Sequence, residues 1–248
     1  MIVESEKDIN SLKAIGRVVA QALKLMMEQA RPGMTTAELD AIGGAFLEKE
    51  GARSAPQVMY SFPGANCISV SPVIAHGIPG DHVLREGELI NIDVSAEMGG
   101  YFADTGGSMV IAKHVPVYEK MIEATKSALV KAVQAAKAGQ PLNGIGKAIQ
   151  DEARRNGFGV IFDLTGHGIG HKLHEEPTQV YNYFKSKDRR VLEEGVVLAI
   201  EPFLTTGKGH VLEEADGWSL RTMDRTIAAQ FEHTVIVTKD EPIILTLA

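Results

Sequence analysis

The stretch LINIDVSAEMGGYFADTGGSMVI, residues 89–111, predicts a long β-hairpin on which the fold can be built. Its first part, residues 89–94, is rich in β-branched residues, which is typical of a strand. The sequence EMGG at residues 97–100 indicates a turn, and residues 101–111 are expected to form the returning strand. We therefore expect a β-sheet that contains this hairpin as a central pair of strands.

One face of the first strand of this hairpin is polar. Because side chains alternate along a strand, this face carries Asn91, Asp93 and Ser95. Asp is disfavoured inside strands, so its presence here needs an explanation. A turn centred on residues 98–99 would set Asp93 directly across from Asp104, with Cβ atoms about 4.5–5.5 Å apart. Two carboxylates at that distance repel each other, so the hairpin predicts a divalent metal ion between them.

Helices are predicted before and after the hairpin in the sequence. Apolar residues recur at helical spacing over residues 6–30. Thr35 and Glu38 have the spacing of a capping box and begin a second helix, which runs to Gly51. The same patterns predict two further helices and a second region of strands and loops, at residues 117–135, 142–156 and 158–245.

The order of helix, helix and strands occurs twice, which indicates an internal duplication. VLREG at residues 83–87, followed by Asp93, matches VLEEG at residues 191–195, followed by Glu201, with an offset of 108 throughout. Coincidence between two amphipathic strands is the alternative interpretation. We favour a single domain of the α+β class, residues 1–248, built from two repeats at about residues 6–112 and 116–245.

Composition and charge argue against several classes of protein. The 248 residues include 25 basic and 32 acidic side chains, and the formal net charge of −7 argues against nucleic acid as a partner. No apolar run approaches the roughly 20 residues that a membrane span needs, and residues 1–10 do not resemble a signal peptide. The one cysteine, Cys67, cannot form an intramolecular disulfide, which favours a reducing, cytoplasmic compartment. Because there is no apolar span, we expect no membrane partner.

Further acidic residues and a group of histidines extend the predicted metal site. The repeat makes Glu201 the counterpart of Asp93, and Glu232 lies just before the β-branched residues 235–237. Three histidines and three glycines occur within TGHGIGHKLHEEP, residues 165–177. Four carboxylates and one neutral imidazole would balance the charge of two divalent ions. Oxygen ligands with one nitrogen suit Mn, Fe, Co or Zn better than Cu.

Seven short segments match one known family in order and spacing: AHGIP (75–79), NIDV (91–94), YFADT (101–105), TGHGIG (165–170), LHEEP (173–177), IEP (200–202) and AQFEHT (229–234). Over nearly the whole chain they resemble the type I methionine aminopeptidases. The resemblance implies the pita-bread fold, in which two pseudo-symmetric α+β halves surround a central metal site. It also implies a single catalytic domain that hydrolyses the N-terminal methionine from nascent proteins and peptides with a small second residue.

The resemblance implies roles for individual residues of the metal site. The ligands of two divalent ions (Co, Mn, Fe or Zn) would be Asp93, Asp104, His167, Glu201 and Glu232. Asp104 and Glu232 would bridge the ions, Glu201 would act as general base, and a hydroxide held between the ions would attack the scissile carbonyl.

The resemblance also implies substrate-binding residues. His76 and His174 would hold the substrate backbone, with His174 stabilising the developing oxyanion. The methionine pocket would contain five apolar side chains: Met59, Phe62, Cys67, Leu173 and Trp218. The family often has aromatic residues where this chain has Met59 and Leu173. The partners would be nascent polypeptide N-termini at the ribosome, and we expect a monomer.

Other functions of the same fold are open alternatives. A proline-specific aminopeptidase usually carries an added N-terminal domain, whereas only about 65 residues precede the first predicted strands. A type II methionine aminopeptidase would have a large late insertion, for which the 27-residue step from His174 to Glu201 leaves no room. A metal-free binding protein of this fold would not need the five ligands.

Overall fold

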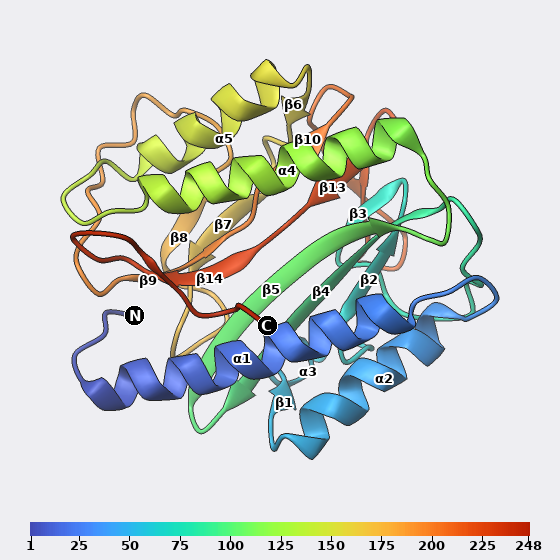
Figure 1. Cartoon of the computed structure of the whole chain (residues 1–248), viewed down its shortest axis with the longest axis horizontal. Coiled ribbons are helices and arrows are strands. Elements are labelled where there is room, and N and C mark those ends of the chain that lie inside the picture. Colours follow the sequence, from blue (N-terminus) through green and yellow to red (C-terminus); the bar gives the residue numbers. More distant parts are fainter.

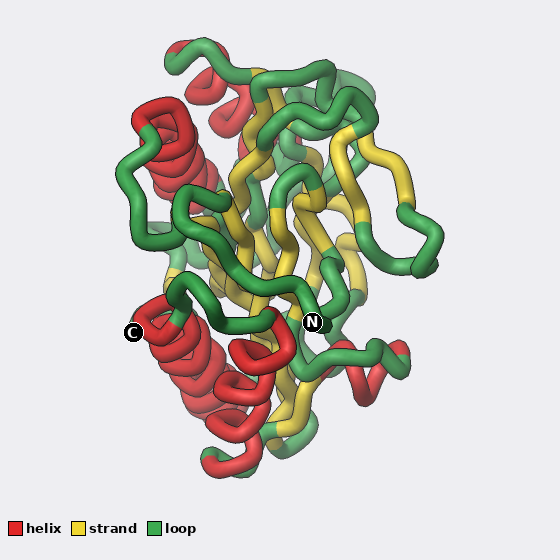
Figure 2. The backbone as a smooth tube through the Cα atoms, turned by 90° about the vertical axis from the view of Figure 1, so that its right-hand side faces the viewer, coloured by secondary structure: helices red, strands yellow, loops and turns green.

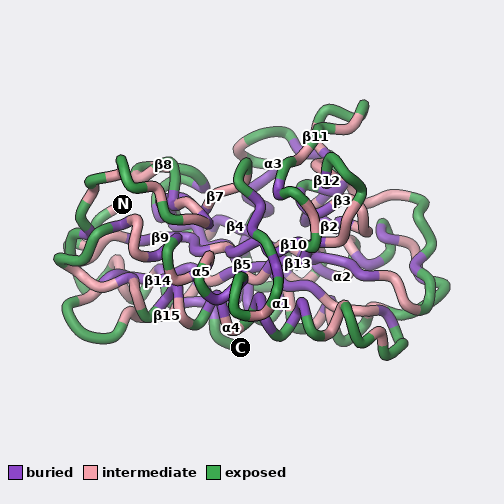
Figure 3. The backbone as a smooth tube through the Cα atoms, turned by 90° about the horizontal axis from the view of Figure 1, so that it is seen from above, coloured by how far each residue is buried: buried purple, intermediate pink, exposed green.

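The computed structural model describes residues 1–248, and four long helices lie on one side of a layer of strands (Figures 1 and 2). A fifth, short helix lies with the loops on the opposite side (Figures 2 and 3). No helix combines the length and apolar character that crossing a membrane requires. The helices are α1 (Glu6–Gln29), α2 (Thr36–Lys49), α3 (Ala55–Tyr60), α4 (Pro116–Ala135) and α5 (Asn143–Arg155).

The strands form four small sheets. In the first sheet β1, β2 and β5 all pair with β4, and in the largest the order is β15-β14-β9-β7-β8. The two others have the orders β13-β10-β6 and β11-β12-β3. The strands are β1 (Arg53–Ser54), β2 (Cys67–Val70), β3 (Val73–Ala75), β4 (Leu89–Met98), β5 (Tyr101–Val110), β6 (Gly159–Val160), β7 (Thr165–Gly168), β8 (Glu175–Tyr181), β9 (Val197–Ile200), β10 (Phe203–Thr205), β11 (Val211–Glu213), β12 (Leu220–Thr222), β13 (Ala228–Gln230), β14 (His233–Ile236) and β15 (Ile243–Ile244).

The four long helices are those that the sequence predicts, with small differences at their ends. The capping box at the start of α2 is confirmed: the Glu38 backbone N–H donates to Thr35 Oγ1 at 3.1 Å, and the Thr35 N–H donates to the Glu38 carboxylate at 2.7 Å. The short helix α3 was not expected, because a helix of six residues is too short to show an apolar period.

The hairpin β4–β5 forms, but its register differs from the prediction. Its turn is Gly99-Gly100, so Asp104 lies opposite Ser95 and Asp93 lies opposite Gly106. The expected direct pairing of Asp93 with Asp104 is therefore wrong. The reason is the turn, since both glycines have positive φ (62° and 87°), as a two-residue hairpin turn of the primed type requires. Asp93 and Asp104 still share a face of the sheet as diagonal neighbours.

The two faces of β4 have different surroundings. Ile92 and Val94 are fully buried and pack with Leu12 and Ile15 of α1 in the core of the first half. Asp93 lies between them in sequence and so faces away from α1. The buried residues follow the layer of strands between the helices and the loops (Figure 3). The helices therefore seal one face of the hairpin, and its acidic side chains lie on the other.

Equivalent backbone contacts occur in the two proposed repeats. Residues 33–34 exchange hydrogen bonds with Leu84, with N···O distances of 2.9 and 2.8 Å. Residues 139–140 do the same with Leu192, at 2.8 and 2.9 Å. In each half these bonds tie the segment between the two long helices to the sequence VLxEG. The equivalence supports the interpretation of a duplicated α+β unit.

The two halves are joined along β5 and β14. The Asp104 backbone N–H donates to Thr234 Oγ1 at 2.9 Å, and that hydroxyl donates to the Asp104 carbonyl at 2.7 Å. The Glu232 N–H donates to the Gly106 carbonyl at 3.0 Å. A Cβ atom at Gly106 would lie only 2.5 Å from Gln230 Oε1, so a side chain there would displace the Gln230 amide. The seam brings Glu232 beside Asp104.

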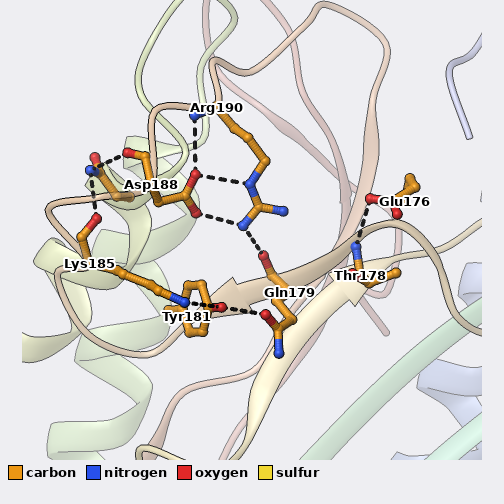
Figure 4. Close-up of polar contacts among 8 residues, drawn as sticks. Glu176, Thr178, Gln179, Tyr181, Lys185, Asp188 and Arg190 are labelled. Carbon is orange, nitrogen blue, oxygen red and sulfur yellow. Dashed lines mark hydrogen bonds and ion pairs between the residues drawn. The ribbon is translucent and has the colours of Figure 1, made fainter.

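A polar network fixes the loop between β8 and β9 (Figure 4). The Arg190 guanidinium donates to both carboxylate oxygens of Asp188, at 2.9 and 2.6 Å, and to the Gln179 carbonyl at 2.7 Å. These bonds from Arg190 lower the pKa of Asp188. The Asn143 amide, at the start of α5, donates to the carbonyls of Lys185 and Asp188 at 3.2 and 2.9 Å. The network anchors the connection to β9, which leads to Glu201.

Candidate metal centre and active site

A cavity of about 290 Å³ collects almost all of the side chains predicted for the site. Its walls include all five predicted metal ligands, both predicted substrate-binding histidines and four of the five predicted pocket residues. Met59 is the exception. Pro56, Tyr60 and Ser95 line the cavity as well, although the sequence did not mark them as site residues.

The five predicted ligands come from neighbouring strands. Asp93 and Asp104 lie on β4 and β5, and His167 lies on β7. Glu201 directly follows β9, and Glu232 lies between β13 and β14. Because β9 pairs with both β7 and β14, the second half presents its three ligands side by side. The seam between β5 and β14 then sets them against the two aspartates.

The geometry of these side chains fits a divalent metal ion. Donor atoms of Asp104, His167 and Glu232 all lie within 4.8 Å of one another, and the three residues are buried. His167 Nε2 is 4.0 Å from Asp104 Oδ2 and 3.8 Å from Glu201 Oε1. These separations are too long for hydrogen bonds and suit ligands that share one ion, since metal–ligand bonds are about 2.0–2.2 Å.

Unpaired oxygen atoms give an independent reason to place an ion here. Asp104 Oδ1 and Glu232 Oε1 are buried and have no hydrogen-bond partner. Buried polar atoms without partners cost free energy, so they are rare in native proteins. A cation between the two carboxylates would satisfy both atoms.

Neighbouring polar groups hold the ligands in place. The Gln230 amide donates to Glu232 Oε2 at 3.0 Å, and the Asn91 amide donates to Gln230 Oε1 at 2.7 Å, which fixes the orientation of Gln230. His167 Nδ1 lies 3.0 Å from the Gly168 carbonyl, which accepts a hydrogen bond from the Nδ1–H tautomer. That tautomer leaves Nε2 free to bind a metal ion.

Without a cation, the site is electrostatically unfavourable for carboxylates. Burial raises the pKa of Asp104, Glu201 and Glu232 well above their usual values, and repulsion between neighbouring carboxylates raises it further. Burial raises the pKa of Asp93 too. Burial, and then the nearby His174, lower the pKa of His167 to about 3, so His167 is neutral at pH 7, as a metal ligand must be.

These pKa shifts predict how metal-free and metal-loaded protein differ in stability. On these carboxylates the folded metal-free protein retains protons that the unfolded chain loses above about pH 4, so their contribution to the free energy of unfolding falls as the pH rises through the raised pKa values. The lowered pKa of His167 acts in the opposite direction, but only below about pH 6.5. A divalent ion at 100 times its Kd should add about 2.7 kcal/mol. Because the ion binds the deprotonated side chains, its contribution to the free energy of unfolding should be larger at pH 8 than at pH 6.

The measurement is thermal unfolding between pH 5 and pH 8, in EDTA and with Mn²⁺. We expect Mn²⁺ to raise the Tm by roughly 5–10 °C at pH 8. Glu232→Gln is the matched control, because it removes one buried carboxylate and should flatten the pH dependence in EDTA and reduce the gain from Mn²⁺. Equal Tm values with and without Mn²⁺ would contradict the assignment of a metal site.

The apolar end of the cavity matches the predicted pocket except at one position. Phe62, Cys67 and Leu173 are buried, and the Trp218 ring meets Phe62 edge to face with centroids 5.2 Å apart. Met59 is instead half-buried against the core of the first half, so its placement in the pocket is corrected. It lies on α3, where successive side chains point about 100° apart, and its neighbour is the one that reaches the cavity.

That neighbour is Tyr60, one of the three cavity residues that sequence reasoning missed. Its Oη lies 2.6 Å from His174 Nδ1. The signal in the sequence was weak, because Tyr60 ends a helix that has no detectable apolar period. His171, the second histidine of the segment 165–177, has no role that the sequence assigns, and it lies outside the cavity. Its ring packs on Tyr101, with centroids 5.0 Å apart, and Nδ1 is 3.2 Å from the Gly100 carbonyl.

The backbone around His76 explains the sequence AHGIP. His76 follows β3 and has a φ of 53°, in the left-handed region that non-glycine residues rarely adopt. At the next residue, Gly77, a Cβ atom would lie 2.4 Å from the Ile68 carbonyl oxygen, so the chain passes too close to β2 for any side chain. Such conformations persist where the surrounding structure enforces them, and here the result is a histidine at the cavity.

Known proteins match the chain over its full length. The family model described as Metallopeptidase family M24 matches residues 10–239. The curated protein "Methionine aminopeptidase 2" of Bacillus subtilis is 47% identical over 247 residues, which are 99% of this chain and 99% of that protein. The crystal structure of methionine aminopeptidase from Rickettsia prowazekii has a TM-score of 0.94 and 34% identity, with complete coverage of both chains. A prolidase from Pyrococcus furiosus shares the fold (TM-score 0.80, 22% identity), and the match covers 66% of it.

Proposed function

Since the chain belongs to metallopeptidase family M24, with the pita-bread fold, we propose that it removes the N-terminal methionine from peptides and nascent proteins whose second residue is small. One observation carries this proposal above the others: a single cavity joins a buried set of carboxylates and an imidazole to an apolar end formed by Phe62, Cys67, Leu173 and Trp218. The first part suits hydrolysis, and the second suits an unbranched apolar side chain.

The proposed metal centre has five ligands and two divalent ions. The four carboxylates with His167 balance the charge of two such ions, and their donor atoms favour Mn, Fe, Co or Zn. Bound ions of this kind supply a deprotonated water as nucleophile at neutral pH and polarise the scissile carbonyl. The ligands are Asp93, Asp104, His167, Glu201 and Glu232.

The chain's own side chains account for proton transfer and substrate orientation. A Glu201 carboxylate oxygen takes the proton that the attacking water loses and passes it to the leaving amine. His174 donates a hydrogen bond to the carbonyl oxygen as negative charge develops on it. His76 orients the amide of the second substrate residue. All three side chains line the same cavity, which supports these roles.

Metal-titrated hydrolysis of a peptide series that varies the first two residues tests the function. We expect methionine release from Met-Ala-Ser that requires a divalent ion, and little release when the second residue is large. Cleavage of substrates with proline in the second position, without preference for methionine in the first, would favour a proline-specific aminopeptidase. Metal-independent peptide binding without hydrolysis would favour a binding protein.

We also propose that the enzyme acts as a monomer on the N-termini of chains emerging from the ribosome. Support for a monomer comes from the site, since one chain supplies all five ligands and every wall of the cavity. Size-exclusion chromatography with light scattering tests the monomer, and methionine release from stalled ribosome–nascent chain complexes tests the substrate.

Substitution of Trp218 should change the choice between methionine and leucine. An apolar pocket separates such similar side chains by only about 1–3 kcal/mol, so we expect a strong but incomplete preference for methionine. Trp218→Ala enlarges the pocket and removes the edge-to-face contact with Phe62, so it should relax that preference. The measurement is the ratio of kcat/KM for Met-Ala-Ser and Leu-Ala-Ser.

Trp218→Phe is the control, because it keeps an aromatic ring against Phe62 and should retain most of the preference. Bound metal should be unchanged in both variants, since Trp218 is not among the proposed ligands. If Trp218→Ala left the Met-to-Leu ratio as it is in the wild type, the methionine pocket would have to lie elsewhere.

A further inference from the structure

Tyr60 lies at the cavity on a helix that is fixed at both ends. It is the last residue of α3, whose first turn is capped by Ser54 Oγ, which accepts from the Gln57 backbone N–H at 3.4 Å. The Ser54 hydroxyl also donates to the Ala65 carbonyl at 2.7 Å, which ties the start of α3 to the segment that follows it. The helix ends at Ser61, whose φ of 57° turns the chain away directly after Tyr60. The phenol ring therefore projects from a support fixed at both ends.

The Tyr60 hydroxyl makes one specific contact, with the imidazole of His174. Oη and Nδ1 are 2.6 Å apart, and the two ring centroids are 5.7 Å apart with the planes tilted by 49°. The two residues are 114 positions apart, one from each half of the chain. Both line the cavity that holds the predicted metal ligands. The contact thus connects the two halves at the site.

The chemistry of the two groups sets the direction of this hydrogen bond. A neutral imidazole has one nitrogen with a proton and one without, and the unprotonated nitrogen can only accept a hydrogen bond. Burial, and then the charge of Asp104, raise the pKa of Tyr60, so the phenol keeps its proton. A phenol is the better donor and a neutral imidazole nitrogen the better acceptor. The hydroxyl therefore donates to Nδ1, and the imidazole proton lies on Nε2.

We propose that Tyr60 is a positioning residue, whose hydroxyl donates to His174 Nδ1 and so fixes both the ring orientation and the tautomer in which Nε2–H can donate to the substrate carbonyl. This inference rests on the proposed function for its catalytic meaning, because the role of His174 comes from that function. The hydrogen bond itself does not depend on it. Tyr60 acts through His174 and need not touch the substrate.

The kinetic test compares Tyr60→Phe with Tyr101→Phe. Both variants lose one tyrosine hydroxyl that contacts another side chain, but the Tyr101 hydroxyl donates to Asp8 at 2.7 Å, outside the cavity. Tyr60→Phe should lower kcat for Met-Ala-Ser about 10-fold, as expected when a residue that orients a catalytic imidazole is lost, with KM changed less than twofold. Tyr101→Phe should leave both constants as in the wild type. An unchanged kcat in Tyr60→Phe, or a loss confined to KM, overturns the proposal.

A spectroscopic test does not require activity. In metal-free protein labelled with ¹⁵N-histidine, with the His174 signals assigned by comparison with His174→Gln, we expect Nδ1 to be unprotonated and Nε2 to carry the proton. Tyr60→Phe should shift the Nδ1 signal towards that of an imidazole nitrogen without a hydrogen-bond donor. A proton on Nδ1 in the wild type overturns the proposal. Wild-type protein that releases no methionine would instead refute the proposed function, and the ¹⁵N spectra would still decide whether the hydrogen bond exists.

Discussion

Asp104→Asn should abolish hydrolysis while the protein stays folded. The substitution removes the negative charge of a carboxylate that has an oxygen within 4.8 Å of donor atoms of His167 and Glu232. We expect kcat/KM for Met-Ala-Ser to fall by about 1,000-fold or more, which corresponds to roughly 4 kcal/mol of lost transition-state stabilisation. Bound metal, measured by mass spectrometry after dialysis, should fall as well.

The apo form of this variant gives a second readout. Burial, and then repulsion from neighbouring carboxylates, raise the pKa of Asp104, so its neutral replacement should leave metal-free protein as stable as the wild type or more stable. Asp188→Asn is the matched control, because it neutralises another aspartate, whose side chain is only 6% exposed and is paired with Arg190 outside the cavity, and it should retain activity. Wild-type activity of Asp104→Asn at saturating metal would rule out Asp104 as an essential ligand.

His174→Ala should lower kcat by roughly 100- to 1,000-fold with little change in metal content. A group that stabilises the developing oxyanion contributes mainly in the transition state, so its loss changes kcat more than KM. The two histidines His167 and His174 lie close together, with ring centroids 4.1 Å apart, but only His167 belongs to the cluster of buried metal donors.

His171→Ala is the control for this experiment, because it removes an exposed histidine of the same loop that lies outside the cavity. It should leave kcat nearly unchanged. If metal content in His174→Ala fell in step with kcat, His174 would be a metal ligand, and its proposed role in stabilising the oxyanion would be wrong.

Local patterns in the sequence were sufficient to predict most of the architecture. The four long helices and the hairpin follow from apolar spacing, capping residues and glycine turns, which depend on residues close together in the chain. The hairpin register was misjudged by one position at the turn, because only Gly99-Gly100 together supply two positive φ angles in succession. Helix α3 was missed because its ends are fixed by Ser54 and Ser61 and not by an apolar stripe.

Predicting the site required more than local patterns. Asp93 and Asp104 were expected to be close because they share one hairpin. In the observed register they are still neighbours, but diagonally and not directly opposite each other. The approach of Glu232 to Asp104 depends on the bond from the Glu232 N–H to Gly106 and on a glycine that leaves room for Gln230. The contact of Tyr60 with His174 likewise connects distant segments, and no pattern of spacing in the sequence predicts it.

The seam between β5 and β14 has a consequence for how the enzyme is made. Asp104 and Thr234 are 130 residues apart, so the hydrogen bonds that place the last ligand beside the first ones cannot form until nearly the whole chain has left the ribosome. Contacts between segments so distant in sequence form late, because a long loop must close before they contribute. The proposed metal centre can therefore be completed only after Glu232 and Thr234 have been synthesised, because a chain that ends before them lacks one ligand and the bonds that place it.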